Sequence, residues 1–283
     1  MVKLPKRKTA MKLASLDYFP RSSGLPMQSA KYWAKEKDRY LRQLLIKDIE
    51  NLTDRPLFVY FAQLDQQINH TDPDDLSEIF QATDLKYGDL FIQTPGGSVD
   101  ATEKIISILR QRFDDYRVIV PSWAKSAGTV IALSSSKIIF GMNSELGPID
   151  PQWQYNGVMV PCDILAADPA IAQHLRAMAQ FATARMRQMA TDLLAKGMMN
   201  GKSPQEIESV IQKISSTNGY MSHGAVIDYD EAKKLGLSIA YLDRNDEIWK
   251  RIWLLYCMYD YDSKAKSIGK IFEGSRFSIA RPR

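Results

Sequence analysis

Two periods of apolar residues alternate along the middle of the chain. Short uninterrupted apolar runs, such as the one at residues 57–61, suit strands that are covered on both faces. Between these runs, apolar residues recur every three or four positions, as on one face of a helix. The pattern predicts strands at residues 57–61, 89–93, 117–120, 137–140 and 237–242. It predicts helices at residues 29–51, 75–83, 98–113, 126–134, 163–196, 203–214, 229–235 and 249–258.

This alternation predicts an α/β fold of repeated β-α units around a covered sheet. The first helix is amphipathic, and we expect its apolar face to pack on the sheet or on a neighbouring subunit; that face carries Leu41, Leu44, Leu45 and Ile49. The last predicted helix closes the ordered chain. With no internal repeat or linker, we expect one domain at residues 29–260, between a basic flexible arm at 1–28 and a basic C-terminal tail at 261–283.

Two local signals set helix ends in the second half of the chain. Ser203-Pro204-Gln205-Glu206 has the residues of a capping box with proline in the first turn, so a helix should begin there. Gly236 follows the helix expected at residues 229–235 and suits a left-handed cap.

The net charge of +4 is unevenly distributed. Residues 1–12 carry +5 and residues 264–283 also carry +5, which leaves −6 for the rest of the chain. Such basic ends could contact nucleic acid or an anionic surface, but solvated ends are the commoner explanation. We therefore assign no function to them.

The composition is that of an ordinary globular protein, with 45% hydrophobic and 25% charged residues. Cys162 and Cys257 lie far apart and fit neither a metal-ligand spacing nor a disulfide framework. The basic N-terminus lacks the apolar stretch of a secretory signal, and no run of about 18 apolar residues occurs to span a membrane. The cytoplasm is the expected compartment.

A glycine turn follows the strand expected at residues 89–93. In Thr94-Pro95-Gly96-Gly97-Ser98 the two glycines allow a sharp turn that points backbone N–H groups outward, just before a helix. Amides at such a turn are suited to stabilise a developing oxyanion. The same residues also suit a plain strand-to-helix turn.

About 30 residues later, the segment Ala-Lys-Ser-Ala-Gly-Thr at residues 124–129 repeats this arrangement. Small neighbours leave the hydroxyl of Ser126 accessible, so Ser126 is the candidate nucleophile. The N–H of Ala127 could then join that of Gly97 in an oxyanion hole. The alternative role of Ser126 is to cap the helix.

Taken together, these motifs resemble the serine dehydrogenase proteinase family. The resemblance rests on the turn at residues 94–98, on residues 125–129 and on Glu-Leu-Gly-Pro-Ile-Asp-Pro-Gln at 145–152, and it covers roughly residues 55–245. The family is similar to the Clp protease proteolytic subunit and to signal peptide peptidase A. The resemblance implies a Clp/crotonase-like fold of stacked β-β-α units, a serine peptidase and a homo-oligomer.

Carried over from the Clp pattern, Ser126 matches the nucleophile, and Gly97 and Ala127 match the oxyanion-hole positions. Gly96 and Ser98, which flank Gly97, are the expected substrate-binding residues.

The general base does not transfer directly. The Clp histidine position falls on Asp150, while His223 falls near the Clp aspartate position, before Glu-Ala-Lys-Lys-Leu-Gly-Leu at 231–237. One hypothesis is therefore an exchange, in which His223 takes the proton from Ser126 and Asp150 orients the imidazole. Both residues also have ordinary explanations, as turn residues.

A lysine base is the other possibility. Signal peptide peptidase A uses a lysine some forty to fifty residues after the serine, but that window here holds Arg176 and no lysine. Lys125 is adjacent to Ser126, points elsewhere at a helix start and is expected to be a solvated surface residue. His70 and His174 are expected to lie in a loop and on a helix face.

The sequence predicts a serine endopeptidase that acts on polypeptides through an acyl-enzyme. No cluster of residues has metal-ligand spacing and no phosphate-binding loop occurs, so we predict no cofactor. One alternative is a crotonase-type acyl-CoA enzyme, which shares the fold and the oxyanion hole but generally uses carboxylates. The other is a non-catalytic oligomeric scaffold of the same fold, favoured by the missing histidine at the Clp position.

Overall fold

The computed structural model of the chain describes residues 29–283, so the basic arm expected at 1–28 lies outside the described residues. The described residues divide into two units, with the boundary between Lys37 and Asp38. In the first unit, α1 (Ala30–Lys35) is capped by the hydroxyl of Ser29, which accepts a hydrogen bond from the N–H of Tyr32. The helix expected at 29–51 is interrupted at Glu36 and continues as α2 (Lys37–Thr53).

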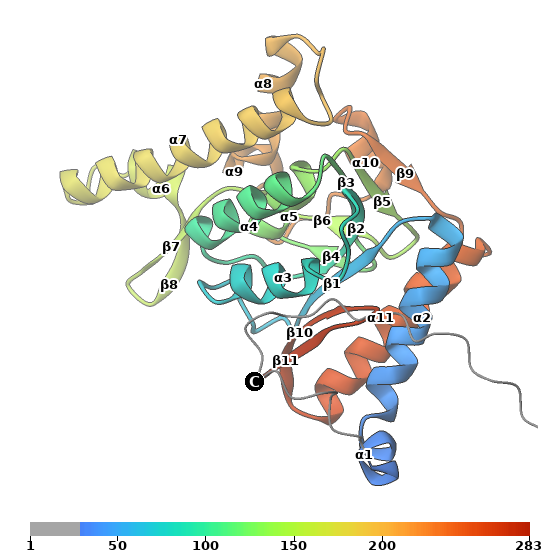
Figure 1. Cartoon of the computed structure of the whole chain (residues 1–283). Helices are drawn as coiled ribbons and strands as arrows, with labels where there is room; N and C mark the ends of the chain where they lie inside the picture. The colour runs from blue at the N-terminus through green and yellow to red at the C-terminus, as the bar shows by residue number, and fades with distance from the viewer. Residues whose placement is uncertain (1–28) are drawn as a thin grey trace, which may run out of the picture. The chain divides into compact units, whose positions relative to one another are not determined.

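A seven-stranded sheet organises the second unit (Figure 1). The strand order is β11-β10-β1-β2-β3-β5-β9, in which β1, β2, β3, β5 and β9 run parallel and β10 and β11 are antiparallel to their neighbours. The strands are β1 (Leu57–Ala62), β2 (Tyr87–Gln93), β3 (Asp115–Ile119), β5 (Lys137–Phe140), β9 (Ile239–Tyr241), β10 (Ile268–Gly274) and β11 (Ser278–Pro282). The predicted α/β fold around a covered sheet is confirmed, and the sheet is mostly parallel.

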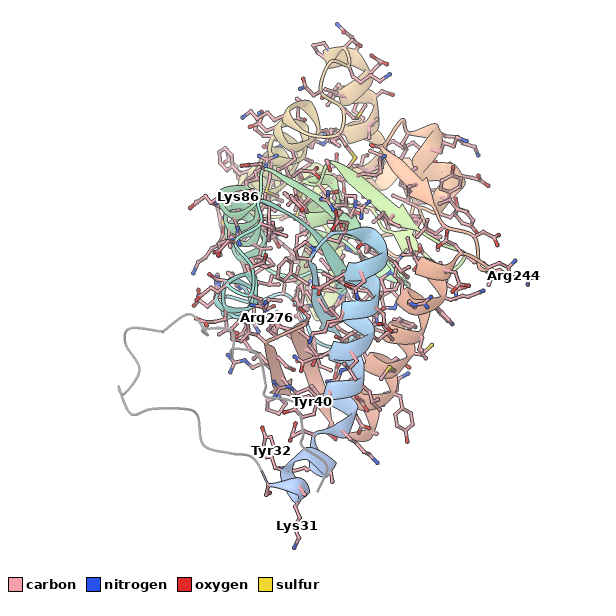
Figure 2. All side chains as sticks on the ribbon, turned by 45° about the vertical axis from the view of Figure 1, so that its right-hand side comes forward. Lys31, Tyr32, Tyr40, Lys86, Arg244 and Arg276 are labelled. Carbon is pink, nitrogen blue, oxygen red and sulfur yellow. The ribbon has the colours of Figure 1, made fainter. Side chains whose placement is uncertain are left out.

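Both faces of this sheet are covered by helices. Phe58 and Tyr60 of β1 point to one face, where they join a core with α3 (Asp72–Phe80), α4 (Val99–Arg112) and α5 (Ala127–Leu133). Val59 and Phe61 point to the other face, toward α2 and α11 (Glu247–Ala265), which lie side by side in Figures 1 and 2. Successive strand residues face opposite sides, so every residue of β1 is buried.

The expected C-terminal tail at 261–283 is wrong for most of its length, because α11 continues to Ala265 and β10 and β11 complete the sheet. Two of the basic residues in this segment, Lys270 and Arg281, are paired with acids of α3. Lys270 Nζ lies 2.7 Å from Asp72 Oδ2, and an Arg281 nitrogen lies 2.5 Å from Asp75 Oδ1. These charges hold the last strands against the sheet.

The prediction of which face of the first helix is buried is also partly wrong. Leu41 and Leu44 are 54% and 57% exposed, whereas Arg42 is buried with Ile46 and Ile49. The guanidinium of Arg42 lies against the carboxylates of Asp262 and Glu273, and this ion cluster turns the helix away from the face that the leucines predict. Burial of Arg42 without such partners would be prohibitively costly.

The helical region after the sheet motifs contains a break and a hairpin that the periodicity does not predict. The helix expected at 163–196 divides into α6 (Cys162–Ala167) and α7 (Gln173–Lys196), since Asp168 and a proline form a turn between them. Before α6, β7 (Gln152–Tyr155) and β8 (Val158–Pro161) form a hairpin.

Three short helices follow α7, namely α8 (Pro204–Ile214), α9 (Thr217–Tyr220) and α10 (Tyr229–Lys234). The predicted capping box of Ser203 and Glu206 is confirmed at the start of α8. Gly236 has φ +78° beyond the end of α10, which confirms its left-handed conformation.

A second, much smaller sheet crosses the ends of the parallel strands. It contains β4 (Trp123–Ala124) and β6 (Glu145–Leu146), which pair in parallel. Single bridges extend it from Ala124 to Thr94 and from Leu146 to Ile227. This sheet therefore joins the loops that follow β2, β3, β5 and α9, where the candidate site residues lie.

Candidate active site

Ser126 occupies the turn between β4 and α5 in a conformation that few non-glycine residues adopt. Its φ is +52° and its ψ is −119°, and its hydroxyl makes no capping hydrogen bond to α5. A helix-capping role for this hydroxyl, the alternative from sequence, therefore does not apply. Strained backbone of this kind costs about 1–3 kcal/mol and is concentrated at functional sites. Ser126 is partly exposed.

The Gly96–Gly97 turn packs directly against Ser126 and the neighbouring backbone. Gly96 has φ +95°, and a Cβ placed on it would lie 2.7 Å from the Ser126 Cβ. Gly97 has φ +148°, and a Cβ there would lie 2.5 Å from the backbone N and O of Ile68. Only glycine fits both positions without displacement. The two motifs that the sequence links are therefore in contact.

Two amides at this contact have no acceptor. Gly96 O accepts from Ile68 N at 2.8 Å and Ser98 N donates to Ile68 O at 2.9 Å, which leaves the N–H of Gly97 outside the bridge. Within residues 29–283, neither Gly97 N nor Ala127 N donates to a protein oxygen. Unpaired donors beside a serine hydroxyl are the elements of an oxyanion hole.

Polar groups of Gly96 and Ser98, the expected substrate-binding residues, already form hydrogen bonds with neighbouring residues. Gly96 N donates to Thr94 Oγ1 at 3.2 Å, and Ser98 Oγ accepts from Ala101 N at 3.3 Å to cap α4. The hydroxyl of Ser98 therefore serves the helix.

Asp150 and His223, 73 residues apart in sequence, lie in contact. His223 Nδ1 is 2.8 Å from Asp150 Oδ1, with 31% of the histidine side chain and 4% of the aspartate side chain exposed. Gln152 Nε2 donates to the other carboxylate oxygen, Asp150 Oδ2, at 2.5 Å. A carboxylate held in this way fixes the imidazole tautomer with its proton on Nδ1, which leaves Nε2 free to accept a proton.

The small sheet connects this pair to Ser126. Leu146 pairs with Ala124 on one side and exchanges two backbone hydrogen bonds with Ile227 on the other, at 2.9 and 3.0 Å. Ala124 is two residues before Ser126, and Ile227 is four residues after His223. In the described part of the chain no hydrogen bond joins Ser126 to His223. Catalytic hydrogen bonds often form only when substrate is bound.

The other candidate bases lie elsewhere or are occupied. His70 is exposed in the loop before α3, and His174 is exposed on α7, as expected. Lys125, expected to be a solvated surface residue, is instead bound: its Nζ lies 2.8 Å from Glu145 Oε1, and its side chain is 17% exposed.

Sequence reasoning missed several residues that support the site. Gln152, which holds Asp150, lies in the Gly-Pro-Ile-Asp-Pro-Gln segment and follows Asp150 by two residues. The hydroxyl of Thr129 lies 2.8 Å from both Ala124 O and Gly147 O, and so links α5 to the loop after β6. The signal for Gln152 was its position in a motif that the resemblance already used.

Cys162 lies near the same aspartate. Burial, together with the charges of Asp163 and Asp150, raises the pKa of its thiol to about 11. The thiol therefore stays protonated at neutral pH.

Two hollows of the surface lie between helices and do not include Ser126. One of about 370 Å³ lies between α4 and α7 and includes Glu103, Arg185 and Met189, and another lies between α3 and α4.

Among residues 29–283 no group of acidic, histidine and cysteine side chains could hold a metal ion. Across the same residues, no helix combines the length and apolar character needed to cross a membrane.

Residues 67–271 match the family model described as ClpP-like SDH-type serine proteinase. Two uncharacterized proteins of Methanocaldococcus jannaschii are related in sequence. One is 37% identical over 154 residues, which are 53% of this chain and 52% of the relative. The other is 25% identical over 179 residues, which are 63% of this chain and 59% of the relative. The chain thus spans only half to three-fifths of these curated relatives.

Solved structures to which this chain is similar include ClpP1 from Listeria monocytogenes, at 18% identity and a TM-score of 0.42, over 70% of this chain and 98% of the other. A membrane-bound stomatin-specific protease matches at 20% identity and a TM-score of 0.45, over 65% of this chain and 79% of the other.

Proposed function

The chain belongs to the ClpP-like SDH-type serine proteinases, and we propose that it cleaves peptide bonds through an acyl-enzyme on Ser126. The observation that carries this proposal is the contact between Ser126, with φ +52°, and the Gly96–Gly97 turn, where the amides of Gly97 and Ala127 have no acceptor among the described residues. A partly exposed serine beside two unpaired donors is the arrangement that acyl transfer requires.

In the proposed reaction, Ser126 Oγ attacks the peptide carbonyl carbon while His223 Nε2 takes the hydroxyl proton. The carbonyl oxygen becomes an oxyanion that accepts hydrogen bonds from Gly97 N and Ala127 N. His223 then returns the proton to the leaving amine, and the acyl-enzyme forms as the C–N bond breaks. Water, deprotonated by the same imidazole, attacks the ester and releases the second product.

Asp150 supports this histidine without exchanging protons. Its 2.8 Å contact with Nδ1 keeps Nε2 free and stabilises the imidazolium that forms. The catalytic order along the chain would then be serine, aspartate, histidine, because a triad is defined by geometry and not by sequence order.

A fluorophosphonate probe with peptide mapping tests the proposal. We expect the label on Ser126, none on Ser126→Ala, and a loss of labelling rate of about 10³-fold or more in His223→Ala. His70→Ala is the matched control, since His70 is also exposed but lies in the loop before α3. A label on another serine, or equal labelling of Ser126→Ala, would exclude Ser126 as the nucleophile.

We also propose that the protein works as a homo-oligomer. Two exposed apolar side chains on α7 support this, since Met178 is 54% and Phe181 is 74% exposed. Sedimentation equilibrium of the wild type and of Phe181→Glu tests it. A monomeric wild type contradicts assembly, and an oligomer unchanged by the substitution removes α7 from the interface.

A further inference from the structure

The sequence predicts Lys125 as a solvated surface residue, but its side chain contacts several segments of the candidate site. Its Nζ lies 2.8 Å from Glu145 Oε1 and donates to two backbone carbonyls, Leu146 O at 3.2 Å and Ala225 O at 3.1 Å. An ammonium group has three N–H donors and no acceptor. All three donors therefore have partners, and the head group is bound on the side of β6 that faces residues 222–227.

The backbone of the same residue is bound on the opposite side. Lys125 N donates to Thr94 O at 3.0 Å, at the start of the glycine turn, and Lys125 O accepts from Gly128 N at 2.8 Å. Lys125 thus joins the oxyanion turn, the start of α5, β6 and the segment after His223. Its neighbour in sequence is Ser126.

The path of the lysine stem depends on a glycine. A Cβ added to Gly147 would lie 2.7 Å from Lys125 Cδ and 3.6 Å from its Cα and Cβ. The stem therefore lies directly across the backbone of Gly147, where any side chain would displace it.

We propose that Lys125 is a positioning residue, whose contacts with Glu145, Leu146 and Ala225 set the position of Ser126 relative to His223. This inference rests on the proposed function, in which His223 deprotonates Ser126. Ala225 is two residues from His223, so release of its carbonyl from Nζ frees the segment that carries the imidazole. Lys125 itself cannot be the base in this arrangement, because a fully paired ammonium has no lone pair to accept a proton.

The test measures acylation by the fluorophosphonate as separate maximal rate and half-saturating probe concentration. We expect Lys125→Met to lower the maximal rate about tenfold to hundredfold, because a misplacement of about 1 Å costs that much, with the half-saturating concentration unchanged. Lys125→Arg should recover part of the rate, because it keeps the charge and the donors. Lys104→Met is the control, since Lys104 is 55% exposed and pairs with Asp74 of α3, which is not a residue of the candidate site.

A second measurement separates positioning from general destabilisation. If Lys125 acts through His223, then Lys125→Met should cost nothing further in a His223→Ala background, because residues that act as a unit are not additive. The same loss in both backgrounds would overturn the proposal, as would wild-type acylation by Lys125→Met. If Lys125→Met does not fold, Glu145→Ala, which removes one of the three contacts, carries the same comparison.

The two proposals fail in distinguishable ways. A wild type that is not labelled on Ser126 contradicts the proposed function. A wild type labelled on Ser126, with Lys125→Met labelled equally fast, contradicts only the positioning role.

Discussion

Gly96→Ala should separate the geometry of the active site from the stability of the fold. The added Cβ would lie 2.7 Å from the Ser126 Cβ and 2.8 Å from Lys125 O. Ordinary contact between such atoms begins at about 3.4 Å, so Ser126 and the glycine turn must separate by about 0.7 Å. The turn also carries Gly97, so the nucleophile moves relative to an oxyanion donor.

The expected loss of acylation follows from that displacement. A shift of this size should lower the rate by about tenfold to hundredfold, which corresponds to about 1.4–2.7 kcal/mol in the activation barrier. Alanine at φ +95° also strains the backbone, at a cost of about 1–3 kcal/mol in the free energy of unfolding.

Gly201→Ala is the matched control. Gly201 has φ +87°, close to that of Gly96, but a Cβ there would meet nothing within 4 Å. Both variants should therefore lose stability through backbone strain in chemical denaturation, with a further loss from the overlap at Gly96, while only Gly96→Ala loses fluorophosphonate acylation. Wild-type acylation by Gly96→Ala, or an equal loss in Gly201→Ala, would refute the assignment of the glycine turn to the oxyanion hole.

Three further predictions address the aspartate, a buried ion pair and a buried tyrosine. Asp150→Asn should lower acylation by about 10⁴-fold with little change in unfolding temperature, because the amide favours the wrong imidazole tautomer; retained activity would remove Asp150 from the mechanism. Lys270→Met should cost about 3–5 kcal/mol in urea denaturation, because it leaves the buried carboxylate of Asp72 without its cation, whereas Lys104→Met should cost under about 1 kcal/mol; equal costs would contradict the role of burial. Burial and the Glu273 charge raise the pKa of Tyr259, so its contribution to stability is complete below about pH 10 and is lost as the pH rises further. Denaturation between about pH 9 and pH 11 should therefore show a smaller decline for Tyr259→Phe than for the wild type, and an identical decline would show that another group is responsible.

Local pattern was sufficient for most of the sheet and its helices. The apolar runs at residues 57–61 and 138–140 became β1 and the buried part of β5, since a strand segment buried on both faces needs apolar residues at every position. The capping box at Ser203 and the left-handed Gly236 were also predictable, because the contacts involved are between neighbours in sequence. The hairpin β7–β8 could have been found, since Asn156 and Gly157 form its turn with positive φ at both residues.

Long-range charge pairs account for the main errors. Periodicity assigns Leu41 and Leu44 to the buried face of α2, but Arg42 is buried instead, because Asp262 and Glu273 from distant elements compensate its charge. The basic C-terminal residues resemble a solvated tail until Asp72 and Asp75 of α3 are brought beside Lys270 and Arg281. Sequence reveals the charge but not the partner.

For the candidate site too, some features follow from the local sequence and others only from tertiary contacts. The sequence by itself determined that Ser126 and the Gly96–Gly97 turn begin helices after strands, because glycine and small residues act on the local backbone. Only the tertiary structure decided that this serine is uncapped, that Asp150 meets His223 and that Lys125 is fully paired. These contacts depend on the small sheet through β4 and β6, which brings together segments about 20 to 100 residues apart. Distances between such segments follow from packing, which local pattern does not encode.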